Sequence, residues 1–284
     1  MRLRVSALCI ALVALAAGGG RSNLSAQAAP QGMTYPPATF TDPDRRAKLA
    51  TAFPEIDKLV RAFMERQHVP GAAWGIVIDG ELAHVGVAGY RELKSKAPVT
   101  RDSVFRIASM TKSFTAMAIM KLRDEGKLSL DDLAERHVPE LKNLRYPTSD
   151  SPRITVRDLL SHATGFPEDN PWGDQQLAAT EDEFSKMMAG GIPFSNAPGV
   201  EYEYSNYGFA ILGRIVTNVS GKPYREYIAE HILRPLGMTS TTLEPGSVPA
   251  DRLAYGYRWE DETWKLEPPL PDGAVGAMGG MLTS

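Results

Sequence analysis

Two short motifs in this chain hold residue types that can carry out nucleophilic catalysis. The first is an S-x-x-K tetrad from Ser109 to Lys112, and the second is a Y-x-N tripeptide from Tyr204 to Asn206. A serine hydroxyl is a weak nucleophile at neutral pH and needs a base beside it. Positions i and i+3 share one face of a helix, so the Lys112 amine can reach the Ser109 hydroxyl. Tyr204 adds a second titratable group and Asn206 an amide, so the two motifs together predict acyl transfer through a serine ester.

The residues after Ser109 predict a helix that would position this serine. Apolar side chains recur near helical spacing; they are Phe114, Met117, Ala118, Met120 and Leu122. Gly126 follows as a residue suited to the position just past a helix end. We therefore expect Ser109 near the helix N-terminus, where free N–H groups and the positive end of the helix dipole favour a developing oxyanion.

Each of these residues also has a simpler structural interpretation. Ser and Lys are common, and a serine before a helix is often only an N-cap. Asn206 precedes a second helical run, Phe209 to Val219, and could cap it in the same way. Tyr204 could be an aromatic residue of the core. The order and spacing of the two motifs favour the catalytic interpretation.

Length and composition indicate an ordinary globular protein. The chain has 284 residues, of which 43% are hydrophobic and 23% charged, enough apolar material for one large domain or two small ones. The formal net charge is −3, and it becomes −6 without Arg2, Arg4 and Arg21. This acidic balance argues against nucleic acid or an anionic membrane surface as a partner.

The N-terminus resembles a secretory signal peptide. Arg2 and Arg4 precede an apolar run from Val5 to Ala17, and Ala26-Gln27-Ala28 is a typical cleavage signal. We expect residues 1–28 to be removed before Ala29, which predicts a periplasmic or secreted protein. No later segment is apolar and long enough to span a bilayer. The single cysteine, Cys9, lies in the signal peptide, so disulfides and thiolate chemistry are excluded from the mature chain.

The remaining chain predicts a mobile leader over residues 29–45 and a hydrolase domain over residues 46–284. A run of strand-forming residues on each side of Asp79-Gly80 predicts a hairpin of residues 73–78 and 82–87. Thr155 and Asp158 resemble a capping box for a short helix that Gly165 would end, and residues 166–200 are rich in loop formers. Further helices are predicted over residues 54–67, 207–220 and 223–233.

At this level of detail the chain resembles the serine β-lactamase and penicillin-recognising family, whose signature includes S-x-x-K. It is most similar to the class C branch with its D-aminopeptidase, D,D-carboxypeptidase and esterase relatives. The resemblance runs from about residue 50 to the last residue. The matching segments are Val69–Gly71, Val104–Ser113, Leu128–Leu133, Thr155–Phe166, Pro198–Gly199, Tyr204–Gly208, Leu212–Gly213 and Pro235–Met238.

The resemblance implies a fold and a set of roles. The fold is α/β (α+β), β-lactamase/transpeptidase-like, with an antiparallel sheet flanked by helices and a separate all-helical region. Ser109 is implied as the nucleophile, Lys112 as its base partner and Tyr204 as the proton shuttle. Asn206 is implied as a hydrogen-bond donor to the surroundings of Lys112 and to the substrate amide. The substrates implied are esters, β-lactams or D-amino-acid peptides, with no metal and no cofactor.

One departure from the family pattern concerns its third motif, Lys or His followed by any residue and Gly, on a strand after Y-x-N. The match at His84-Val85-Gly86 precedes Ser109, and we interpret it as chance. The family continues beyond the position that matches Ser284, so we expect a C-terminally truncated chain that lacks the last strands of the sheet. The alternative function is a non-catalytic penicillin-fold binding protein or an inactive fragment.

Other hydrolase classes do not fit the sequence. The histidines are scattered, with no pair at metal-ligand spacing, which argues against a zinc hydrolase. There is no G-x-S-x-G elbow, which argues against an α/β-hydrolase. His162 lies in a segment that resembles the family, and we interpret it as structural. The substrate and the oligomeric state are not predicted.

Overall fold

The computed structural model describes residues 39–170, 172–269 and 271–284. The chain divides after Arg45, and residues 46–284 form the unit that contains both motifs. The predicted signal peptide, residues 1–28, and the leader as far as residue 38 lie outside the described residues. A short helix, α1 (Arg45–Ala50), begins at the residue after which the chain divides.

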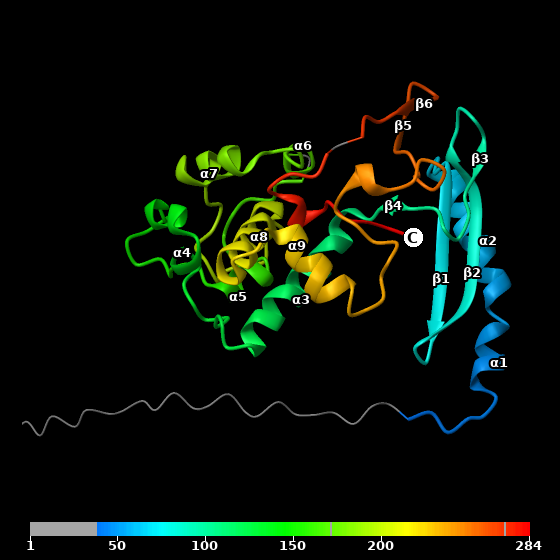
Figure 1. The fold of residues 1–284 in the computed structure, drawn as a ribbon, viewed down its shortest axis with the longest axis horizontal. Helices are drawn as coiled ribbons and strands as arrows, with labels where there is room; N and C mark the ends of the chain where they lie inside the picture. The colour runs from blue at the N-terminus through cyan, green and yellow to red at the C-terminus, as the bar shows by residue number, and fades with distance from the viewer. Residues whose placement is uncertain (1–38, 171, 270) are drawn as a thin grey trace, which may run out of the picture. The chain divides into compact units, whose positions relative to one another are not determined.

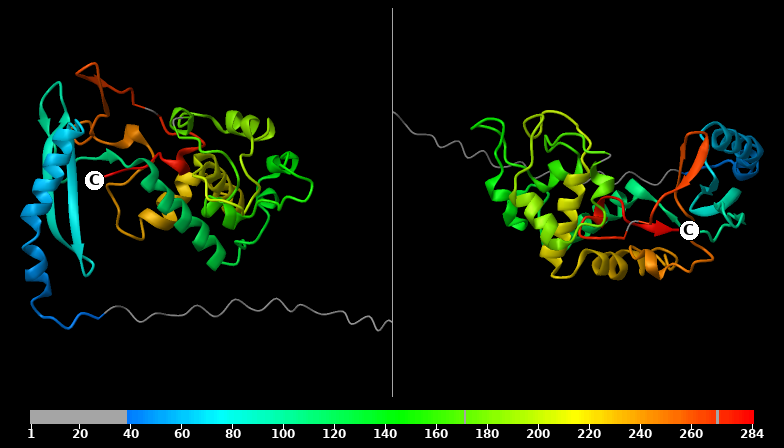
Figure 2. Two further views of the ribbon diagram at one scale, coloured as in Figure 1. Left: turned by 180° about the vertical axis from the view of Figure 1, so that it is seen from behind. Right: turned by 90° about the horizontal axis from the view of Figure 1, so that it is seen from above.

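A hairpin and one helix form the first layer of this unit. Strands β1 (Gly71–Ile78) and β2 (Glu81–Glu92) pair antiparallel, and β3 (Ala97–Pro98) pairs with the far end of β2. Asp79 and Gly80 have φ of 53° and 79°, as a tight hairpin turn with two left-handed residues requires. The predicted hairpin is confirmed. Helix α2 (Phe53–Arg66) lies along the sheet, as the views in Figure 1 and Figure 2 agree.

The His84-Val85-Gly86 sequence belongs to this layer. The His84 Nε2 atom lies 2.7 Å from Asp57 Oδ1 on α2, and the same carboxylate oxygen accepts a hydrogen bond of 2.9 Å from Trp74 Nε1. The His84 ring also stacks on Phe53. These contacts join α2 to the hairpin, so the structure gives His84 a packing role.

A helical region forms the larger part of the unit. Its main helices are α3 (Thr111–Asp124), α4 (Ala134–His137), α5 (Val156–Leu160), α7 (Glu181–Ala189), α8 (Asn206–Ser220) and α9 (Tyr224–Ile228), which continues as a π-helical turn, Ala229–Leu233. Helix α8 is buried from Asn206 to Gly213, and it packs against α3, α5 and α9. The most deeply buried side chains belong to this region, among them Ile119, Leu122, Leu159, Ile211, Leu212 and Ile215.

Two details of the predicted helices differ from the structure. Helix α5 has the predicted capping box of Thr155 and Asp158, but it ends at Leu160, where His162 already has a left-handed φ of 56°. Gly165 therefore does not end it. The predicted loop over residues 166–200 contains α6 (Trp172–Gln175) and α7, and α7 begins with its own capping box of Thr180 and Glu183. The many Gly and Pro residues around α7 concealed its short helical pattern.

The remaining strands are short. Strand β4 (Phe105–Arg106) pairs with β7 (Leu282–Thr283), and β5 (Tyr257–Glu260) pairs with β6 (Thr263–Leu266). The β4–β7 pair places the last described residues beside the segment that leads into the S-x-x-K motif. Within the described ranges the largest sheet has three strands, and no helix has the length and hydropathy of a membrane span.

Candidate active site

Ser109 lies in a single 3-10 turn, Ala108–Met110, that leads directly into α3. Its side chain is exposed to solvent. Ala108 has a φ of 45°, an uncommon conformation for alanine. The Thr111 hydroxyl donates a 2.7 Å hydrogen bond to the Ala108 carbonyl and so holds this turn. The predicted place of Ser109 at the start of the helix is confirmed.

The hydroxyl of Ser109 contacts both titratable groups that the sequence singled out. Its Oγ lies 2.6 Å from the Tyr204 hydroxyl, and the Lys112 Nζ atom donates to it over 3.1 Å. The nucleophile–base distance in an active site is typically about 2.6–3.2 Å. The i, i+3 spacing therefore brings Lys112 to Ser109 as expected, and the fold adds Tyr204 from a segment 95 residues away.

Lys112 is surrounded by oxygen atoms that accept hydrogen bonds. Besides Ser109 Oγ, its Nζ donates to the Asn206 Oδ1 atom over 2.7 Å and to the Met278 carbonyl over 2.6 Å. The residue is only 7% exposed, and its Nζ lies 4.9 Å from the centre of the Tyr204 ring. Asn206 thus presents its oxygen to the lysine, whereas the resemblance implied a donor.

A loop that the sequence did not single out holds the Y-x-N motif. The Asp169 carboxylate accepts hydrogen bonds from the backbone N–H groups of Asn206 and Tyr207, both at 2.7 Å, and from the Ser205 hydroxyl at 3.2 Å. A carboxylate at a helix N-terminus satisfies free N–H groups and complements the helix dipole. Asp169 stands 37 residues before Asn206, so nothing in the local sequence pattern reveals this cap.

A second remote segment is hydrogen-bonded to α3. The Met281 N–H donates to the Thr111 hydroxyl over 3.1 Å, and the Thr115 hydroxyl donates to the Ala277 carbonyl over 2.7 Å. Together with the Met278 carbonyl on Lys112, these bonds fix residues 277–281 along the buried face of α3. Figure 2 shows this segment, in red, beside the green helix. Sequence reasoning did not identify Met278 as a partner of Lys112.

His162 supports the Tyr204 side of the site. Its Nδ1 accepts a 3.1 Å hydrogen bond from the Ser205 N–H, and its ring lies 4.6 Å from the Tyr204 ring. Burial lowers the pKa of His162 below the usual 6.5, and the charge of Lys112 lowers it further, while Asp169 opposes both. A protonated Nδ1 could not accept from Ser205. The neutral ring therefore fits the geometry, in keeping with the structural role expected for His162.

We expect this hydrogen bond to make stability depend on pH. Because the folded pKa of His162 is lowered, the unfolded chain binds the proton more readily, and stability is lost as pH falls from about 6.5 toward the folded value. The variant His162→Asn keeps an acceptor and tolerates the left-handed backbone. Unfolding free energies measured from pH 7.5 to 5 should fall less for this variant than for the wild type. Parallel curves for the two proteins would contradict the assignment.

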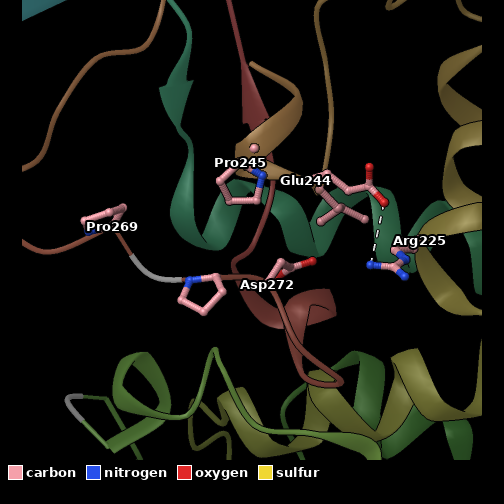
Figure 3. A pocket seen from close by; sticks show the side chains of 8 residues that line it. Arg225, Glu244, Pro245, Pro269 and Asp272 are labelled. Atoms are coloured by element: carbon pink, nitrogen blue, oxygen red, sulfur yellow. Dashed lines mark ion pairs between the residues drawn. The ribbon is translucent and has the colours of Figure 1, made fainter. Parts of the chain in front are cut away.

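A cavity of about 350 Å³ lies elsewhere in the same unit (Figure 3). Its lining includes Arg225, Glu244 and Asp272 but none of the four predicted site residues. Arg225 and Glu244 form an ion pair of 3.6 Å within this lining. The Asp272 Oδ1 atom is buried and has no hydrogen-bond partner among the described residues. Burial raises the pKa of Asp272 to about 7, against the charges of Arg106 and Arg225.

An antiparallel sheet with flanking helices, a helical region, and a serine on a helix start beside lysine and tyrosine define the β-lactamase/transpeptidase-like class. Residues 56–284 match the Beta-lactamase family, and the chain belongs to it. Protein flp of Staphylococcus aureus strain MW2 is 33% identical over 218 residues, which are 76% of this chain and 43% of that protein. Penicillin-binding protein 4* of Bacillus subtilis is 29% identical over 68% of this chain and 43% of its own length. The chain thus spans less than half the length of these curated relatives.

Solved structures agree with this assignment. The octameric penicillin-binding protein homologue of Pyrococcus abyssi superimposes with a TM-score of 0.68 at 33% identity, over 81% of this chain and 53% of that one. A class C β-lactamase of Rhodobacter sphaeroides gives 0.62 at 25% identity, over 79% and 60%. EstCE1, a hydrolase with promiscuous acyltransferase activity, gives 0.69 at 21% identity, over 84% and 70%, which shows a shared fold.

Proposed function

We propose that this protein is a serine hydrolase that works through an acyl-enzyme on Ser109. The Ser109 oxygen attacks a carbonyl carbon, and its proton passes to the Tyr204–Lys112 pair. The bond to the leaving group then breaks, and that pair returns a proton to the departing atom. A water molecule then attacks the Ser109 ester in the same way, and its proton passes to the Tyr204–Lys112 pair. The acid is released, and the pair returns a proton to the Ser109 oxygen. The observation that carries the proposal is the contact of Ser109 Oγ with both Tyr204 Oη and Lys112 Nζ.

We propose simple esters as the first substrate class, ahead of β-lactams and D-amino-acid peptides. An activated ester needs little help for its leaving group, whereas a β-lactam also demands fast deacylation of a bulky acyl group. Proteins similar to this chain include Penicillin-binding protein 4*, a class C β-lactamase and, at the level of the fold, EstCE1, a hydrolase with promiscuous acyltransferase activity. Parallel assays of short-chain nitrophenyl esters and a chromogenic cephalosporin rank the classes, and faster cephalosporin turnover would reverse our order.

The decisive experiment is covalent labelling of Ser109. A fluorophosphonate probe should modify the wild-type protein at Ser109, and the Ser109→Ala variant should be neither labelled nor able to hydrolyse nitrophenyl esters. Ser113 is an exposed serine one position beyond Lys112 on the same helix, so Ser113→Ala is a matched control that should keep both properties. Mass spectrometry of the labelled peptide identifies the modified serine.

The outcome separates the proposal from the non-catalytic alternative. A folded wild-type protein that neither reacts with the probe nor hydrolyses esters would favour a binding protein of the same fold. Label on a serine other than Ser109, or full turnover by Ser109→Ala, would reject the mechanism.

A further inference from the structure

We propose that Asn170 is a positioning residue that acts on Lys112 through Asn206, a role that rests on the proposed function. The Asn206 side-chain amide bridges the two residues. Its Oδ1 accepts from Lys112 Nζ at 2.7 Å, and its Nδ2 donates to the Asn170 Oδ1 atom at 2.9 Å. Asn170 follows Asp169, the residue that caps α8, so one loop holds both the backbone and the side chain of Asn206.

The surroundings of Asn206 hold its side chain in this bridging position. The residue is 3% exposed. The backbone of Gly173 lies against its side chain, since a Cβ at position 173 would come within 2.7 Å of Asn206 Nδ2 and 2.8 Å of its Cβ. A buried amide needs partners for both of its ends, because an unpaired buried donor or acceptor costs about 1–3 kcal/mol. Asn170 supplies the acceptor for the amide nitrogen.

The orientation of this amide matters for the proposed chemistry. The oxygen accepts from a lysine ammonium, whereas the nitrogen carries two N–H groups and cannot accept. A rotation that brings Nδ2 toward Lys112 would place the amide N–H groups opposite the N–H groups of the ammonium, with no acceptor between them. By holding the nitrogen, Asn170 keeps the oxygen on Lys112, and Lys112 in turn stays within 3.1 Å of Ser109 Oγ.

Removal of the Asn170 acceptor should therefore lower the rate of turnover, because the amide oxygen that orients Lys112 is less firmly held. The loss of alignment should lower kcat about five- to tenfold, the worth of roughly one hydrogen bond. The KM for a small nitrophenyl ester should change little.

The test is a double-mutant cycle on the full chain with nitrophenyl acetate as substrate. Asn170→Ala should lower kcat in the wild-type background and have almost no further effect in the Asn206→Ala background, since residues in one network are not additive. Asn170→Asp keeps an acceptor oxygen and should recover most of the lost rate. Asn218→Ala is the matched control, because Asn218 also donates from its side chain, to the His137 carbonyl at the other end of α8.

Equal losses of kcat in both backgrounds, or a lower melting temperature with kcat unchanged, would overturn the role of Asn170. A separate readout covers the case in which the wild type has no turnover. The side-chain amide signal of Asn206, recognised in an NMR spectrum by its loss in Asn206→Ala, should move in Asn170→Ala and stay in place in Asn218→Ala. An unmoved signal would reject the bridge itself, whereas a missing label on Ser109 rejects only the proposed hydrolase activity.

Discussion

Replacement of Lys112 by alanine should lower kcat/KM for ester hydrolysis by about 10²–10⁴-fold, the usual contribution of a general acid–base group. Lys112 is the only residue in the described ranges whose side chain joins Ser109, Asn206 and Met278 by hydrogen bonds. Its loss leaves those three acceptors without their shared donor. Steady-state kinetics at saturating and limiting ester separate the effects on kcat and KM, and we expect the loss to appear in kcat.

Tyr204→Phe tests the other half of the pair. It removes the hydroxyl that lies 2.6 Å from Ser109 Oγ and keeps the ring beside His162. We expect a loss within the same range, and the double variant should lose far less than the product of the two, because the groups act as a unit. Tyr202→Phe is a matched control, since Tyr202 is 70% exposed and near in sequence. Wild-type rates for either Lys112→Ala or Tyr204→Phe would contradict the mechanism.

The second large effect is a pH dependence of the unfolding free energy that comes from the Asp272 carboxyl. Because burial raises the folded pKa of this carboxyl to about 7 from 3.8, the folded state holds the proton more tightly than the unfolded chain. Its stabilising contribution is full below pH 3.8 and is lost as pH rises through about 7. A shift of this size corresponds to about 4 kcal/mol at most, since one pKa unit is worth about 1.36 kcal/mol. Asp272→Asn should therefore unfold with a higher free energy than the wild type at pH 8, and the advantage should disappear near pH 4.

Close contacts around Asp272 leave its carboxyl little room to adopt another position. Its Oδ1 lies so close to the backbone of Gly276 and Gly280 that a Cβ at either position would approach to 2.3 and 2.0 Å. Denaturant unfolding from pH 4 to 8 measures the effect. Asp251→Asn is the matched control, because Asp251 is an exposed carboxylate outside the lining of the cavity and should leave the slope nearly unchanged. The same pH slope in wild type and Asp272→Asn would contradict an ionising Asp272.

Local sequence patterns predicted those parts of the structure that depend on neighbouring residues. The S-x-x-K spacing placed Lys112 on Ser109 because the helix geometry fixes the i, i+3 relation. The Asp79-Gly80 turn and the Thr155 capping box were recognisable because a few adjacent residues determine each of them. The helix predicted over residues 207–220 is also found, as α8, and Gly221 follows its last residue with a φ of 71°.

Other parts depend on tertiary contacts and could not be predicted in this way. The carbonyl of Met278 binds Lys112 through its backbone, which any residue type could provide. Asp169 and Asn170 lie in a segment whose Pro and Asn residues indicate only a loop, and their partners stand more than thirty positions away. These partners determine the orientation of the Asn206 amide. The sequence pattern therefore predicted that Asn206 belongs to the site, but not that its side-chain oxygen accepts a hydrogen bond from Lys112.

The hydrogen bonds between α3 and residues 277–281 also bear on how the protein folds. The sequence separations are 162 for Thr115 with Ala277, 166 for Lys112 with Met278 and 170 for Thr111 with Met281. Contacts between such distant positions form slowly, because the entropy of closing a long loop must be overcome first. The hydrogen bonds within α3 and within the β1–β2 hairpin, by contrast, join residues that are close in sequence. During synthesis on the ribosome, Ser109 and Lys112 would therefore emerge long before the segment that completes the lysine's hydrogen bonds, and assembly of the site would be among the last steps of folding.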